Sequence, residues 1–242
     1  MDPITAIAAS GMRARMESLD LLANNLANAS TSGYKADREF YSLYVAPEAQ
    51  EEDPSSTMPL IERPWTDLSE GAAQPTGNPL DLALSGRGFF AVDTPGGPLY
   101  TRNGGLHLDA AGTLVTVEGH PVRSVAGAPI TLAPSAPIEI SPDGTIRQNG
   151  AAAGRIAVAD FPSGGLVKQG NNYFRPTDPS ATPAAATGAV VAQGRLEASN
   201  TGSAESAVRL IQVMRQFEML QKAVGLAGEM DAKAVQEVAK VG

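Results

Sequence analysis

The chain has 242 residues, enough to bury a hydrophobic core, and its net charge is −8 at pH 7. Because no dense run of lysine and arginine interrupts this acidic balance, the composition argues against a surface for nucleic acid or anionic membranes. The absence of cysteine excludes disulfides, thiolate metal ligands and cysteine nucleophiles. Frequent turns follow from 25 glycines and 18 prolines, which is typical of many short strands rather than of a helical bundle.

Residues 1–34 are expected to form a helix of about 25 residues that starts at Pro3 and stops at Ser32-Gly33. No proline occurs in residues 4–29. On one face of this helix, small and apolar residues recur at the helical spacing of three or four, at Ile4, Ile7, Ala8, Gly11, Ala14, Ser18, Leu22, Leu26 and Ala29, with Leu19 and Leu21 beside them. Charged or amide side chains occupy the opposite face.

This helix ends in an unusual cluster of asparagines, within "LDLLANNLANASTSGYK". Asn28 lies at the edge of the apolar face, where termination of the helix explains it. Asn25 lies among leucines about two turns before Gly33, where termination does not explain it. A polar amide in an apolar seam costs stability unless a partner satisfies it. We therefore expect Asn25, helped by Asn28, to make amide contacts across a helix–helix interface.

The middle of the chain divides into an extended linker, residues 35–76, and a β-rich domain, residues 77–200. The linker contains the acidic, proline-containing stretch "PEAQEEDPSSTMP", which has no periodicity and is expected to be a loop. The β-rich domain contains three expected hairpins: "FFAVDTPGGPLYT", "GLHLDAAGTLVTV" and "IEISPDGTIRQ", the last turning at Asp143-Gly144.

Residues 201–242 are expected to form a second helix that pairs with the first. Its main apolar face repeats every three or four residues and includes Leu210, Val213, Phe217, Leu220 and Val224. A second apolar strip lies well round the helix and consists of Val208, Met219, Leu226 and Met230. A helix with two apolar sides needs two neighbours, and one of them is expected to be another copy of the chain.

The expected fold class is therefore α+β, with a β-rich central domain of short strands and hairpins. The terminal helices are expected to form a coiled-coil-like helical domain. The expected inter-subunit helix interface consists of Ile4, Ile7, Leu19, Leu22, Asn25, Leu26, Asn28, Leu210, Val213, Phe217, Leu220 and Val224.

Residue types that carry chemistry are sparse. His107 and His120 are the only histidines, and neither has a ligand-like partner at the spacing of a metal site. Asp109 and Asp143 occupy expected turns, where aspartate is favoured for its hydrogen bonds to the backbone. The sequence therefore predicts no catalytic residue, no metal, no cofactor and no small-molecule substrate.

The chain resembles the bacterial flagellar axial proteins of rod and hook. "ANNLANASTSGYK" is similar to their N-terminal signature, "NPLDLALSGRGFFAV" with "YTRNG" and "DAAGTLVTVEGHPV" to the start of their β domain, and "GRLEASN" with "LIQVMRQFEMLQKAV" to the entry of their C-terminal helix. The three motifs occur in the family's order along nearly the whole chain. Within the family, "RQFEMLQK", "GHPV" and "ISPDGTI" are most similar to the proximal-rod branch, and the distal-rod or another hook–basal-body branch is the alternative.

The resemblance implies a structural subunit that polymerises through its terminal helices into the rod, the tubular shaft that transmits torque across the periplasm. It implies export by the flagellar type III apparatus without a cleaved signal peptide, and other rod proteins as partners. A different class remains open on the residues alone: a β module that binds cell-wall carbohydrate or peptide, with helical dimerisation ends. That function requires an aromatic-lined groove.

Overall fold

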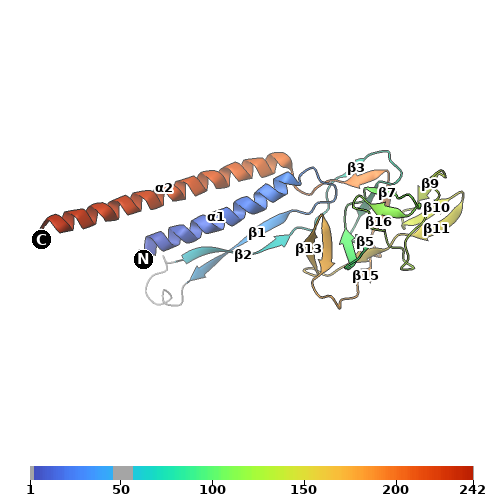
Figure 1. Cartoon of the computed structure of the whole chain (residues 1–242), viewed down its shortest axis with the longest axis horizontal. Helices are drawn as coiled ribbons and strands as arrows, with labels where there is room; N and C mark the ends of the chain where they lie inside the picture. Colours follow the sequence, from blue (N-terminus) through green and yellow to red (C-terminus); the bar gives the residue numbers. More distant parts are fainter. Residues whose placement is uncertain (1–2, 46–56, 242) are drawn as a thin grey trace. The chain divides into compact units, whose positions relative to one another are not determined.

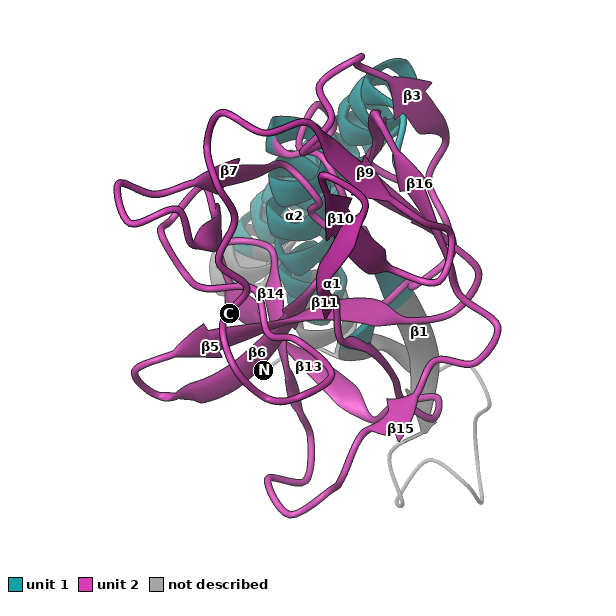
Figure 2. Cartoon of the chain, turned by 90° about the vertical axis from the view of Figure 1, so that its right-hand side faces the viewer, with its two compact units in different colours: residues 1–27, 37–65, 201–242 teal, residues 28–36, 66–200 magenta. Residues whose placement is uncertain are grey.

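A computed structural model describes the backbone of residues 3–45 and 57–241, and side chains for residues 9–39, 64–230, 232 and 233 (Figure 1). The chain divides into two compact units, coloured separately in Figure 2. Unit 1 comprises residues 1–27, 37–65 and 201–242, and unit 2 comprises residues 28–36 and 66–200. Each unit therefore combines segments that are distant in sequence.

Unit 1 contains the two helices, α1 (Pro3–Ala27) and α2 (Ser203–Val241), and a two-stranded sheet of β1 (Asp37–Val45) and β2 (Thr57–Thr66). α1 packs against both α2 and β1, and the helices run side by side in Figure 1. The apolar periodicity of both ends therefore predicts the helices correctly, and Pro3 is the first residue of α1 as expected. Gly11 faces α2: an added Cβ there would lie 3.6 Å from Leu220 Cδ1, which is an ordinary van der Waals contact.

The structure differs from the expected linker at residues 35–76. Within it, β1 and β2 are paired strands of nine and ten residues, and residues 47–56 of the acidic stretch expected to be a loop lie outside the described residues. Lys35 and Ala36 are buried in unit 2. The sequence of β1, "EFYSLYV", is rich in the aromatic and β-branched residues that strands favour.

Unit 2 is built from short strands in several small sheets. The largest sheet has the order β13-β14-β6-β5-β12-β15, with β5 (Phe89–Thr94), β6 (Gly97–Thr101), β12 (Val158–Asp160), β13 (Leu166–Gly170), β14 (Tyr173–Pro176) and β15 (Ala184–Ala185). A three-stranded sheet has the order β11-β10-β9, with β9 (Ile138–Ile140), β10 (Thr145–Gln148) and β11 (Ala151–Arg155). Three strand pairs complete the unit: β3 (Ala73–Pro75) with β17 (Arg195–Glu197), β4 (Leu82–Ser85) with β16 (Val190–Gln193), and β7 (Leu106–Leu108) with β8 (Leu114–Thr116).

The three hairpins expected from the sequence are confirmed as the antiparallel pairs β5–β6, β7–β8 and β9–β10. Asp109 and Asp143 occupy their turns as expected: Asp109 Oδ1 accepts hydrogen bonds from the amides of Ala111 and Thr113. Asp143 accepts from both the amide and the hydroxyl of Thr145, and these bonds lower the pKa of its carboxyl group.

The core of unit 2 has two clusters of buried side chains. The larger is mainly aliphatic and contains Leu82, Leu84, Phe90, Val92, Leu106, Leu114, Val122, Ile130, Leu132, Ile140, Ile146, Ile156, Tyr173 and Val191. The smaller is aromatic and contains Phe89, Ala91, Tyr100, Ala159, Phe161 and Phe174. Alternate residues of β5 enter different clusters, since successive side chains point to opposite faces of a sheet.

Candidate functional site: the terminal helices

α1 has one buried face, made of Ala14, Ser18, Leu22 and Asn25. Leu19 and Leu26 are half-buried beside it. The Ser18 hydroxyl donates a hydrogen bond to the Glu39 carboxylate at the start of β1. The side chains of Ile4 and Ile7 lie outside the described residues, although α1 itself extends through them.

Asn25 is only 5% exposed and is paired with the backbone of Asp37, the first residue of β1. Its Nδ2 donates to the Asp37 carbonyl at 2.7 Å, and its Oδ1 accepts from the Asp37 amide at 3.0 Å. The side chain thus meets the donor and acceptor of one peptide backbone, as a neighbouring strand would. The partner that the amide requires is therefore found in the same chain, whereas a contact from Asn25 to a neighbouring subunit stays a prediction.

Asn28 follows the last residue of α1 and takes part in the turn that ends the helix. The Thr31 amide donates to the Asn28 carbonyl at 3.0 Å, and the Thr31 hydroxyl donates to Asn28 Oδ1 at 3.2 Å. These bonds fit the role of asparagine in helix termination.

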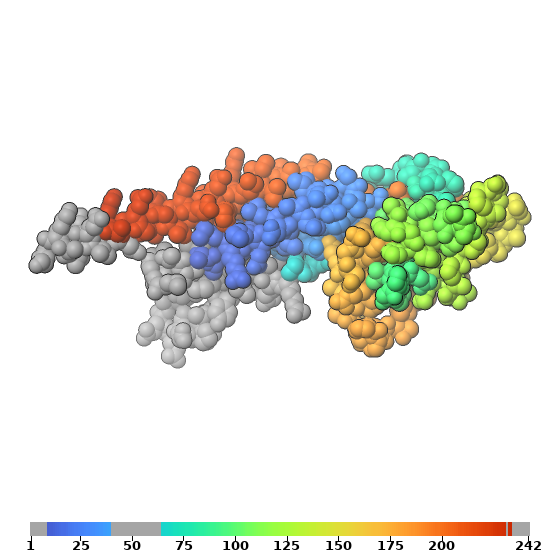
Figure 3. Space-filling model, in the orientation of Figure 1, coloured from blue at the N-terminus to red at the C-terminus, as the bar shows by residue number. Residues whose placement is uncertain are grey.

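On α2 the main apolar face is covered within the chain. Val213 is buried, and Leu210, Phe217, Leu220 and Val224 are half-buried. α1 is the helix that packs against α2, as the blue and orange surfaces of Figure 3 show. The two helices thus cover part of each other's apolar surface.

The second apolar strip of α2 is open to solvent. Its four side chains are each more than half exposed, from 56% for Val208 to 71% for Met230. At 100° per residue, Val208, Met219 and Leu226 lie within about 20° of one another and roughly opposite Val213. Three further apolar side chains outside the predicted strip are also exposed: Ile211, Met214 and, on α1, Met16. Ile211 could have been found from its position three residues after Val208.

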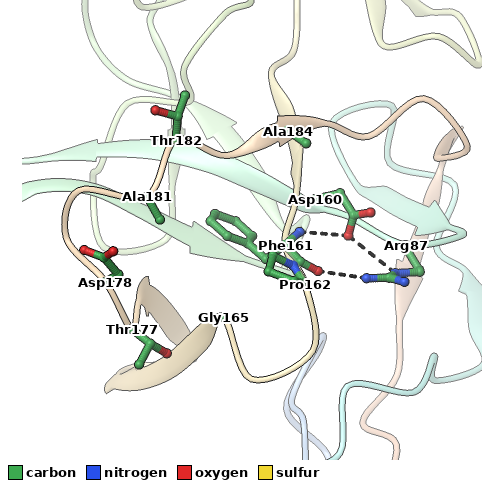
Figure 4. Close-up of a pocket in the computed structure, with 10 residues that line it drawn as sticks. All are labelled: Arg87, Asp160, Phe161, Pro162, Gly165, Thr177, Asp178, Ala181, Thr182 and Ala184. Carbon is green, nitrogen blue, oxygen red and sulfur yellow. Dashed lines mark hydrogen bonds and ion pairs between the residues drawn. The ribbon is translucent and has the colours of Figure 1, made fainter.

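Elsewhere in unit 2 a pocket of about 420 Å³ is lined by Arg87, Asp160, Phe161, Pro162, Gly165, Thr177, Asp178, Ala181, Thr182 and Ala184 (Figure 4). Arg87 Nη2 donates to the Phe161 carbonyl at 2.8 Å, and its Nε lies 3.5 Å from Asp160 Oδ1. Asp178 accepts from the amide and hydroxyl of Ser180. The charged groups of the lining hold the surrounding loops, and none of them pairs a nucleophile with a base.

Within the described residues, no group of three or more histidine, aspartate or glutamate side chains could hold a metal ion. His107 is exposed on β7, and the ring of His120 contacts the ring of Tyr173, with centroids 5.6 Å apart. None of the described helices combines the length and apolar character needed to span a membrane. The aromatic side chains Phe89, Tyr100, Phe161 and Phe174 are buried in the smaller core cluster, so these four cannot line an open binding groove.

Three family models match the chain in order. The model "Flagella basal body rod protein" matches residues 6–35, "Flagellar hook protein FlgE/F/G D1 domain" matches residues 83–148, and "Flagellar basal body rod FlgEFG protein C-terminal" matches residues 192–237. The flagellar basal-body rod protein FlgF of Caulobacter vibrioides is 33% identical over 247 residues, covering the whole of both chains. The chain belongs to the flagellar basal-body rod protein family.

Further relatives come from two branches of this family. FlgF of Mesorhizobium japonicum is 34% identical over 214 residues, covering 88% of each chain. FlgG of Agrobacterium fabrum is 32% identical over 258 residues, covering 93% of this chain and 95% of the relative. The chain is thus a structural subunit of the flagellar rod and not an enzyme, which confirms the resemblance found in the sequence.

Proposed function

We propose that the chain polymerises through α1 and α2, which form a coiled-coil-like helical layer with the helices of neighbouring copies. The observation that carries this proposal is the exposed second strip on α2, made of Val208, Met219, Leu226 and Met230. It lies on a helix whose other apolar face is already occupied within the chain. The residues expected at the inter-subunit helix interface, which run from Ile4 to Asn28 on the N-terminal side and from Leu210 to Val224 on α2, would contribute further contacts between copies.

The energy available from the strip favours association. Full burial of one large apolar side chain contributes about 1.5–3 kcal/mol, and the strip offers four side chains in each copy. Large exposed apolar side chains that gather on one side of a helix are typical of a protein–protein interface. Repetition of one such contact from copy to copy produces a helical array when the rotation does not close.

We place the subunit in the proximal part of the rod, with the distal rod as the alternative. The proximal assignment is supported by the segment "RQFEMLQK" of α2 and by the end-to-end match to FlgF of Caulobacter vibrioides. In this position the subunit would form part of the shaft that crosses the periplasm and transmits torque. Its partners would be copies of itself, other rod proteins and, before assembly, the flagellar type III export apparatus. Export would proceed without a cleaved signal peptide.

Complementation of a non-motile strain that lacks the gene tests the polymerisation. The full chain is expected to restore swimming, whereas a chain without residues 210–242 is exported but not incorporated into basal bodies. Rescue of swimming by the shortened chain would contradict the proposal. For the position, basal bodies are purified from a strain that lacks the distal rod protein. Retention of the chain supports the proximal assignment, and its loss supports the distal one.

A further inference from the structure

The chain passes between the two units four times, after residues 27, 36, 65 and 200. On the unit 2 side, the chain enters and leaves through three segments, residues 28–36, 66–69 and 197–200. Hydrogen bonds inside unit 2 join the three segments to one another, and one side chain, Asn200, takes part in bonds to both of the others. We call Tyr34, Lys35, Ala36, Asp67, Ser69, Glu197 and Asn200 the crossing cluster.

Asn200 bonds through three of its groups. Its Oδ1 accepts from the Ala36 amide at 2.7 Å, and its own amide donates to the Tyr34 carbonyl at 3.2 Å. Its Nδ2 donates to the Asp67 carbonyl at 2.7 Å and lies 3.3 Å from the Ser69 carbonyl. A backbone hydrogen bond from the Asp67 amide to the Ala36 carbonyl, 2.8 Å, joins the other two segments directly. The last residue before each return to unit 1 is therefore bonded to the other segments.

A buried ion pair lies beside these bonds. Lys35 is fully buried, and its Nζ lies 2.5 Å from Glu197 Oε1 and donates to the Ser69 carbonyl at 2.5 Å. Glu197 Oε2 accepts from Arg102 Nη1 at 3.2 Å, and Oε1 accepts from the Gly71 amide at 2.9 Å. The backbone carbonyl of Glu197 accepts from the Gly33 amide at 2.7 Å. Since a buried charge without its partners is costly, these side chains fix the relative positions of the same three segments.

We infer that the crossing cluster is a positioning device that holds the chain passages after residues 36, 65 and 200 together as one cooperative element of unit 2. The inference rests on the proposed function for its purpose: load passing along the chain between the units is then shared among these three passages instead of reaching one of them first. Cooperative opening is the physical signature of such an element, because segments that share one network of bonds open together.

Amide hydrogen exchange on the full chain tests this inference. Asn200→Leu removes the side-chain bonds to Ala36, Asp67 and Ser69. If the cluster is one element, exchange speeds up by at least about tenfold at Ala36, and also at Gly33 and Asp67, whose own acceptors are unchanged. Acceleration at Ala36 alone, or at none of the three, would overturn the inference.

Gln193→Leu is the matched control. Gln193 also bonds three backbone groups, the carbonyls of Pro79 and Ile138 and the amide of Ile140, but it does not belong to the crossing cluster. Exchange is expected to speed up at Ile140 and to stay unchanged at Gly33, Ala36 and Asp67. If Gln193→Leu accelerates those three amides as much as Asn200→Leu does, general destabilisation explains the effect and the inference is wrong.

Asn200→Asp covers the case in which Asn200→Leu does not fold. It keeps the acceptor for the Ala36 amide and removes the donor to Asp67 and Ser69. Faster exchange at Gly33 and Asp67 is the expected result, and exchange like that of the wild type would overturn the inference. Because exchange is measured on the unassembled chain, its outcome is independent of whether the subunit polymerises as proposed.

Discussion

The amide side chain of Asn25 in α1 forms two hydrogen bonds with the backbone of Asp37, at 2.7 Å and 3.0 Å. These bonds join the end of the N-terminal helix to the first residue of β1. The residues between them in the sequence, 28–36, belong to unit 2. The asparagine that interrupts a leucine-rich face is therefore explained by the backbone groups it satisfies, and its replacement has a measurable consequence.

Asn25→Leu is expected to keep α1 helical and to destabilise its contact with β1. Leucine favours helices, but the Asp37 amide and carbonyl lose their partner, which costs roughly 1–3 kcal/mol for each group left unpaired. Far-ultraviolet circular dichroism and exchange at the Asp37 amide measure the two effects. Ala23→Leu, which places leucine at an exposed position of the same helix, is the control. Unchanged protection of Asp37 would show that the pairing contributes little.

Gly33→Ala is expected to destabilise unit 2 strongly. Gly33 has φ of +67°, and a Cβ there would lie 2.4 Å from the carbonyl carbon of Arg102. Gly119→Ala is the control, because Gly119 has φ of +84° and nothing within 4 Å of an added Cβ. The control should lose about 1 kcal/mol in free energy of unfolding from the backbone conformation alone, and Gly33→Ala about 2 kcal/mol more. Equal losses in urea unfolding would contradict the close approach at Gly33.

The buried Lys35 predicts a dependence of stability on pH. Burial lowers the pKa of Lys35 below its usual 10.5, although the Glu197 carboxylate acts in the opposite direction. Between the pKa of the folded protein and 10.5 the unfolded chain binds more protons at this residue, so its contribution to the free energy of unfolding rises with pH. The difference in this free energy between the wild type and Lys35→Met should therefore shift in favour of the wild type as pH rises toward 10.5.

Urea unfolding of both proteins at several pH values measures this difference. Lys222→Met, at an exposed position of α2, controls for the loss of one positive charge. A difference between wild type and Lys35→Met that stays constant or falls as pH rises toward 10.5 would contradict the prediction.

Met219→Glu is expected to abolish incorporation into the rod while leaving the free chain as stable as the wild type. Met219 is 61% exposed, so its replacement removes little internal packing, but a carboxylate in a buried interface lacks a partner. Gln221→Glu adds the same charge to an exposed position about 160° around the helix and is expected to have a smaller effect. Swimming of complemented cells, with the amount of exported chain as reference, measures the result. Normal swimming with Met219→Glu would show that the strip stays open in the rod.

The sequence predicts the local elements well and the non-local ones poorly. The helices and the three hairpins follow from periodicity and turn residues that are close together in the chain, as at Asp143-Gly144. β1 and β2 lie on either side of the acidic stretch, where the sequence predicts an extended linker and not a strand pair. The bonds of Asn200 and Lys35 join residues more than 160 positions apart, and nothing in either local segment identifies the other.

In the candidate interface, too, local features are predictable from the sequence and non-local contacts are not. The second strip of α2 is predicted from the sequence because four residues of one helix define it. The partner of Asn25 was not found, because the sequence shows that an amide needs a partner but not which backbone supplies it.

Site-specific photocrosslinking at position 219 tests the central claim most directly. A photoreactive amino acid replaces Met219 in the full chain, expressed in cells that lack the native gene and that swim, and basal bodies are purified after irradiation. The account predicts a covalent product between position 219 and the terminal helices of a second copy or of another rod protein, identified by peptide mapping. Swimming cells whose rods contain the chain, but in which position 219 crosslinks to no other subunit, would contradict it.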